Sequence, residues 1–164
     1  NAWIGENPKV LILGTMPGDI SLDKQVYYYN TSRNSFWKLM NCIFGPQKAG
    51  ESNKDFITSK GIALWDCLKC GIRKGSTDAG YNLHALVPND LQILLDNQPT
   101  IKVIFLNGIG KGSKRHLTTP YIFNHFFSGM KMNCEVLNLP STANTNRISF
   151  DEKLKVWASI KDFL

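Results

Sequence analysis

Four short, mostly apolar segments restrict the fold of this chain more than any other feature. They cover residues 9–13, 62–65, 101–106 and 135–139, and the first is followed at once by Gly14. Segments of this length without polar–apolar alternation are typical of strands that are buried on both faces of a sheet. They therefore predict a sheet whose two faces are both covered.

Helical patterns lie between and after these strands. Residues 36–44 carry apolar side chains at helical spacing before Gly45 and Pro46, and a second helix is predicted for 90–97. A third begins near Ser149, where Ser149 and Glu152 have the spacing of a capping box. Strands that alternate with helices predict an α/β fold, a parallel sheet with helices on both faces.

The pattern predicts one domain over residues 1–164, because the chain contains no internal repeat, no low-complexity tract and no charge-rich linker. In parallel sheets with helices on both faces, ligands bind beyond the carboxyl ends of the strands. The loops at 14–35, 66–82, 107–112 and 140–149 are therefore the places to look for a site.

Charge and composition narrow the class of partner. The net charge of +6 favours a polyanion, because lysine and arginine replace the cations condensed on phosphates. No apolar run approaches the roughly 20 residues of a membrane-spanning helix, and residues 9–13 are too short for a signal peptide. The four cysteines are best interpreted as reduced thiols. We expect a cytoplasmic protein without a membrane partner.

Several common chemistries find no support in the sequence. Cys67 and Cys70 have metal-ligand spacing, but a second pair is missing, so we expect no metal. The glycine-rich segment 108–114 fits neither nucleotide-binding fingerprint; it needs only a tight strand-to-helix turn, with a backbone contact to a DNA phosphate as the alternative. No serine occupies a hydrolase elbow and no pair of carboxylates stands out.

Two loops combine turn residues with polar and aromatic side chains. The first contains GTMPG at 14–18 and YYYNTSRNSFW at 27–37; the second is LPSTANTNR at 139–147. Three consecutive tyrosines can pack on the sheet, or one can offer a face on which an extruded base stacks. The second loop can be a capped connection, or it can contact phosphates and base edges.

These motifs, in this order, resemble the uracil-DNA glycosylase superfamily. The second loop is similar to the LPNPSGLNR-type loop of mismatch-specific glycosylases, and closer to the LPSTSPAN loop of the hypoxanthine branch. Segments at 63–66, 73–78, 89–91 and 107–108 also resemble that branch, so the similarity covers nearly the whole chain. The resemblance implies a three-layer α/β/α sandwich around a four-stranded parallel sheet.

The resemblance also implies the chemistry, which is monofunctional hydrolysis of the N-glycosidic bond of a deaminated base, hypoxanthine or also uracil, in base excision repair. DNA is the partner, the protein is a monomer and no cofactor is needed. The asparagine before the Phe-Trp pair, Asn34, takes the catalytic role. The base-binding residues are Gly14, Thr15, Met16, Pro17, Gly18 and Tyr29. The DNA-binding residues are Ser141, Thr142, Asn144, Thr145, Asn146 and Arg147.

Three departures from the family pattern stand out. Met16 occupies the position at which many members carry an Asp or Asn that orients the attacking water, and a thioether cannot do this. Thr31 and Ser32 replace the His-Pro of the related branch, and Asn144 stands where its second loop has proline. Two alternatives therefore stay open, an inactive DNA-binding module on the same fold and a nucleotide-binding protein that uses residues 108–114.

Overall fold

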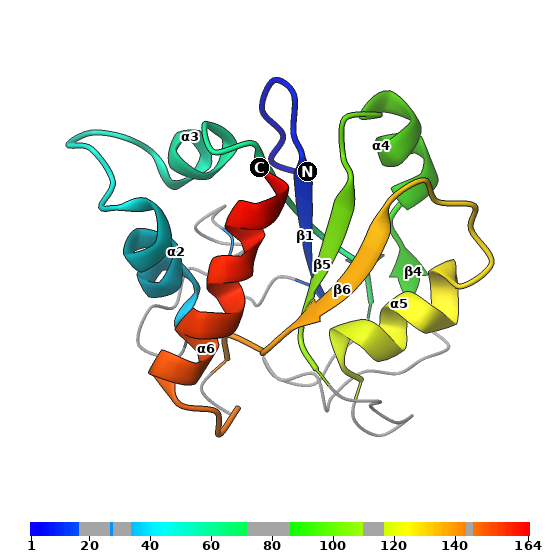
Figure 1. The fold of residues 1–164 in the computed structure, drawn as a ribbon. Helices are drawn as coiled ribbons and strands as arrows, with labels where there is room; N and C mark the ends of the chain where they lie inside the picture. Colours follow the sequence, from blue (N-terminus) through cyan, green and yellow to red (C-terminus); the bar gives the residue numbers. More distant parts are fainter. Residues whose placement is uncertain (17–26, 28–33, 72–85, 110–116, 144–145) are drawn as a thin grey trace.

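A four-stranded parallel sheet forms the centre of the computed structural model, which describes residues 1–16, 27, 34–71, 86–109, 117–143 and 146–164 (Figure 1). The strand order is β2-β1-β5-β6. The bounds are Val10–Gly14 for β1, Ile62–Asp66 for β2, Val103–Asn107 for β5 and Glu135–Leu139 for β6. Each strand pairs in parallel with its neighbours, which confirms the sheet predicted from the four apolar segments.

Side chains of β1 alternate between two separate cores. Val10 and Ile12 belong to one apolar cluster, whereas Leu11 and Leu13 belong to the other. All four are fully buried, because a strand directs successive side chains to opposite faces and helices cover both faces here. The three-layer arrangement therefore follows from an uninterrupted apolar strand.

Each face has its own set of helices (Figure 1). Helices α2 (Phe36–Phe44), α3 (Asn53–Thr58) and α6 (Phe150–Trp157) cover one face, and α6 continues as a 3-10 helix over Ala158–Phe163. Helices α4 (Leu91–Asn97) and α5 (Thr119–Phe127) cover the other. The rings of Phe36 and Trp157 meet edge to face at 5.7 Å, which joins α2 to α6.

Local signals explain where several elements begin and end. Ser149 and Glu152 form the predicted capping box, in which the Glu152 amide donates to Ser149 Oγ at 3.3 Å. Strand β5 starts two residues later than predicted because the amide of Ile101 donates to Gln98 O in a turn. Helices α3 and α5 and the small antiparallel pair β3 (Leu68–Cys70) and β4 (Val87–Pro88) were not predicted.

No helix among the described residues combines the length and the apolar character that crossing a bilayer requires. All four strands of the central sheet run the same way, so their carboxyl ends share one edge. This edge is where the sequence places the two motif loops.

Candidate functional site

The first motif loop starts at the carboxyl end of β1, held by the chain that follows β2. Gly14 pairs with Asp66, and the carbonyls of Gly14 and Thr15 accept hydrogen bonds from Cys67 N at 2.8 Å and Leu68 N at 3.0 Å. Thr15 is buried, and Met16 packs against the apolar cluster on the α4–α5 face. The start of this loop is therefore fixed by backbone bonds to the chain that follows β2.

A buried chain of polar side chains connects the first motif loop to the second. Thr15 Oγ1 lies 3.0 Å from Thr119 Oγ1, and Thr119 Oγ1 donates to the Asn107 carbonyl at 3.1 Å. Asn107 Nδ2 donates to Thr142 Oγ1 at 3.0 Å, and Thr142 N donates to Asn107 Oδ1 at 3.0 Å. Satisfied polar chains of this kind fix geometry, because each buried group without its partner would be costly.

The second motif loop also pairs with the segment before α2. Asn34 and Ala143 form an isolated antiparallel bridge, and the Thr142 carbonyl accepts from Ser35 N at 2.9 Å and Ser35 Oγ at 3.1 Å. On the other side, Trp157 Nε1 donates to Pro140 O at 2.9 Å. Two segments that are more than 100 residues apart in the sequence are thus held side by side.

Asn34 begins helix α2 with its side chain. Its Oδ1 accepts the amide of Phe36 at 2.9 Å, whereas Ser35 makes no side-chain cap. An amide N–H can be paired only with an oxygen, so this bond fixes which end of the Asn34 side chain is Nδ2. None of the described residues accepts a hydrogen bond from that Nδ2, which leaves two N–H groups for a ligand. The capping and catalytic interpretations of Asn34 are therefore compatible.

A cavity of about 320 Å³ lies where α2, the second loop and α6 meet. It is lined by Asn34, Ser35, Lys38, Asn146, Phe150 and Lys153, with Ile148. No acidic side chain of the described residues lines it. Lys38 Nζ lies 4.2 Å from the centre of the Phe150 ring. Nitrogen donors and two cations make this cavity suited to anions and to the hydrogen-bond acceptors of nucleic acid.

The remaining predicted contacts of the second loop separate into exposed and internal groups. Arg147 is exposed, Ser141 Oγ accepts the Ala143 amide at 3.3 Å, and Asn146 Oδ1 accepts the Ile148 amide at 2.9 Å. Thr142 is fully buried, with its amide and hydroxyl bonded to Asn107. We therefore revise its expected phosphate contact to a positioning role. Five predicted residues lie outside the described part of the chain: Pro17, Gly18, Tyr29, Asn144 and Thr145.

Of the three consecutive tyrosines, Tyr27 is described and packs as part of the core. Its ring meets that of Trp3 edge to face at 5.1 Å, and its carbonyl accepts from Trp37 Nε1 at 2.9 Å. Burial, and secondly the Asp66 carboxylate, raise the pKa of the Tyr27 hydroxyl far above its usual value. The packing interpretation thus holds for Tyr27.

Cys67 and Cys70 differ in burial. Cys67 is buried, and burial, with a smaller contribution from Asp66, raises the pKa of its thiol. Cys70 is exposed. Within the described ranges, no three His, Cys, Asp or Glu side chains gather at one place.

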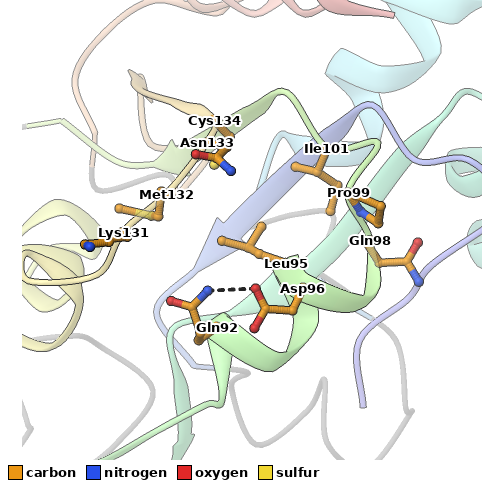
Figure 2. A pocket seen from close by; sticks show the side chains of 10 residues that line it. All are labelled: Gln92, Leu95, Asp96, Gln98, Pro99, Ile101, Lys131, Met132, Asn133 and Cys134. Atoms are coloured by element: carbon orange, nitrogen blue, oxygen red, sulfur yellow. Dashed lines mark hydrogen bonds between the residues drawn. The ribbon is translucent and has the colours of Figure 1, made fainter.

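A second cavity, of about 220 Å³, lies at the opposite end of the sheet (Figure 2). Ile101 and Cys134, which line it, precede β5 and β6, and Gln92 Nε2 donates to Asp96 Oδ1 at 2.9 Å on its α4 side. None of the predicted site residues lines this cavity. The carboxyl edge therefore remains the candidate site.

The sequence interpretation missed four residues of this edge. Asn107 and Asp66 are buried polar residues at the ends of their strands, a signal that the sequence does contain. Lys38 is the single charged residue of α2, which is otherwise typical of a lysine on the exposed side of a helix. Lys153 follows Phe150 by three residues and precedes Trp157 by four, so its spacing places it on the apolar face of α6, a signal that the sequence does contain. Only the packing of α2 against α6 brings them to one cavity.

Comparison with known proteins gives consistent relatives. The model of the uracil DNA glycosylase superfamily matches residues 3–161. A protein of Methanosarcina barkeri named hypoxanthine DNA glycosylase is 31% identical over 158 residues, covering 94% of this chain and 91% of its own. A protein of the same name from Methanosarcina acetivorans is 30% identical over 162 residues, covering 97% and 94%. The solution NMR structure of a candidate uracil DNA glycosylase from Methanosarcina acetivorans matches with a TM-score of 0.72 and 29% identity, covering 98% and 92%.

Proposed function

The chain belongs to the uracil DNA glycosylase superfamily and is a DNA N-glycosylase, and we propose that it removes hypoxanthine from DNA in base excision repair. The observation that carries the proposal is the pairing of residues 34–35 with residues 142–143. This pairing sets the Asn34 amide beside the loop that would enter the duplex. Both relatives that carry the hypoxanthine name span nearly the whole chain, which supports the choice of base.

The reaction needs the base outside the helix. A base within a duplex cannot be reached, so the nucleotide is rotated out at a cost of a few kcal/mol. The exposed Arg147, with Asn144 and Thr145, fills the gap that the nucleotide leaves. The buried bonds between Thr142 and Asn107 hold this loop against the sheet while it does so.

Hydrolysis then exchanges one bond for another at the sugar. The oxygen of a water forms a bond to C1′ as the C1′–N9 bond breaks, and a proton of that water ends on the released base. Negative charge grows on the base during this step, and fixed N–H dipoles stabilise such charge without a carboxylate. The two N–H groups on Asn34 Nδ2 donate to the leaving base, or Oδ1 orients the water by accepting a hydrogen bond from it with its second lone pair.

The base lies against the turn that runs from Gly14 to Gly18, stacked on Tyr29. Met16, in this segment, offers a thioether in place of a fixed polar side chain. A flexible thioether accepts a larger base and gives up strong selection at the uracil edge. This composition favours a purine such as hypoxanthine over uracil.

The enzyme acts without a lyase step, as a monomer, and as one domain over residues 1–164. The motifs at 14–18, 27–37 and 139–147 contain no lysine that could form a Schiff base. Lys153 lines the same cavity as Asn34, so the absence of a lyase step should be tested by chemical trapping. Borohydride should trap no covalent complex with DNA during turnover.

One observation favours a second candidate function, a DNA-binding module without activity. Met16 cannot orient water, and it occupies the position that does so in many relatives. Asn34 can orient the water in place of Met16, so we prefer the active enzyme to the inactive DNA-binding module.

A panel of duplexes tests the proposal. Each carries one hypoxanthine, uracil, xanthine or mismatched thymine, and base release is measured under single-turnover conditions. We expect hypoxanthine to be released by the wild type, and about 10²-fold more slowly by Asn34→Ala. Binding of all duplexes with release of no base would establish the inactive module instead.

A further inference from the structure

We propose that the cavity between α2 and α6 is a binding site for one phosphodiester group of the DNA strand, held by the ammonium groups of Lys38 and Lys153. The inference rests on the proposed function, because it takes the polyanion to be DNA, and it adds a site to it. Among the contacts predicted from the family, none involves either lysine. The evidence is the burial of Lys153, the composition of the lining and the position of the cavity.

Lys153 is the unusual residue. Only 5% of its surface is exposed, and among the described residues none gives its ammonium group a hydrogen bond or an ion pair. The stem of Lys153 is covered, and a cation that is largely removed from water is costly unless an anion pairs with it. Desolvation accordingly lowers the pKa of the Lys153 ammonium. An anion that entered the cavity would supply the missing partner.

The lining offers several donors and no competing carboxylate from the described residues. Asn34 and Asn146 each commit Oδ1 to a backbone amide, at 2.9 Å in both cases, which leaves their Nδ2 groups to donate. The nearest acids in the sequence are Asp151 and Glu152, which are both exposed. Glu152 is turned back to its own cap, with Oε2 at 2.7 Å from Ser149 Oγ and 3.1 Å from Ser149 N.

The position of the cavity favours a backbone phosphate over other anions. Asn34 lines it, so the site adjoins the residue proposed to act on the nucleotide. Asn146 brings in the second loop, and Arg147 follows it directly. The start of α2, a helix of nine residues, adds the positive end of its dipole. A phosphodiester has one negative charge and two exposed oxygens, which suits two cations and two amide donors.

The test compares Lys153→Met with Lys155→Met. Both changes remove one positive charge from α6, but Lys155 is exposed and does not line the cavity. Methionine keeps the apolar volume of the buried stem, so Lys153→Met should fold at least as stably as the wild type in urea titration. Lys38→Met tests the second cation in the same way.

Binding to an undamaged duplex is measured over a range of salt concentrations. Each phosphate that the protein no longer neutralises lowers the slope of log Kd against log salt by about 0.9. We expect this decrease for Lys153→Met and for Lys38→Met, and an unchanged slope for Lys155→Met. Slopes equal to wild type for both cavity variants would overturn the proposal.

Replacing single phosphates by neutral methylphosphonates then locates the bound phosphate. At one position, the methylphosphonate should weaken DNA binding by the wild type but should not weaken binding by Lys153→Met any further. The reason is that the two changes remove the same interaction. Inorganic phosphate can instead stabilise the wild type against urea and not Lys153→Met, while the two proteins have the same slope of log Kd against log salt for the duplex. In that case the site binds free phosphate and the proposal fails. These measurements do not depend on excision. A protein that shows the expected change in slope but releases no base would therefore overturn the proposed function and leave the phosphate site standing.

Discussion

Asn107 and Thr142 hold each other through two hydrogen bonds of 3.0 Å, one in each direction between the end of β5 and the second motif loop. Both residues are buried. The carbonyl of Thr142 in turn accepts from Ser35, next to Asn34. A loop that enters DNA must keep its shape while it displaces a base, and this pair ties the loop to the rigid sheet.

Asn107→Ala should therefore reduce stability and excision together. The change leaves the amide and the hydroxyl of Thr142 buried without partners, at a cost of about 1–3 kcal/mol in the free energy of unfolding. Urea titration measures this cost, and single-turnover kinetics measures excision. Thr142→Ser, which keeps the hydroxyl and the amide, serves as the control and should stay near wild type. Full stability in Asn107→Ala would show that the pair does not hold the loop.

Asn34→Ala should slow single-turnover base release by about 10²-fold, the usual contribution of a positioned polar group. Asn34→Ser separates catalysis from capping, because serine can still accept the Phe36 amide but has no N–H groups to donate. It should lose as much excision as the alanine variant while keeping more stability. Excision at the wild-type rate in either variant would leave Asn34 as a helix cap only.

Arg147→Ala should weaken excision from duplex DNA about tenfold more than excision from a single strand, where no stack has to be opened at a cost of a few kcal/mol. The readout is the ratio of the two single-turnover rates with one lesion in matched sequences. Arg147→Lys keeps the charge without the planar group and shows which of the two matters. An equal decrease on both substrates argues against a role in filling the gap.

Exhaustive treatment with EDTA should leave the rate of base release unchanged. The expectation follows from the sequence, in which Cys67 and Cys70 have metal-ligand spacing but no second pair of ligands accompanies them. Metal analysis of the purified protein provides the control. Zinc or iron bound one to one, with activity that chelation removes, would contradict it.

The sequence predicted the frame of this fold because the relevant signals are local. Strands made of apolar residues alone indicate burial on both faces, and the spacing of Ser149 and Glu152 indicates where α6 begins. Both depend on residues that are close together in the chain. The order of the motifs, through the family resemblance, then placed Asn34 and the second loop at one edge.

The links between these elements could not be predicted in the same way. Asn107 and Thr142 are 35 residues apart, and nothing in either segment identifies the other as its partner. Thr142 lies in a polar loop and was expected to contact DNA, yet it is buried because it fills the space beside β5. Lys153 has the spacing of the apolar face of α6, but its sequence does not show that Asn34 and Lys38 of a distant segment line the same cavity.

Competition between deoxyinosine and deoxyuridine shows which of the two bases the enzyme prefers. Duplexes of identical sequence carry either deoxyinosine or deoxyuridine, with different fluorescent labels, and the protein meets both in one reaction. We predict that deoxyinosine is processed faster, because the flexible thioether of Met16 would accept a larger base and would offer no polar contact that selects uracil. A clear preference for deoxyuridine would contradict the assignment of hypoxanthine as the substrate.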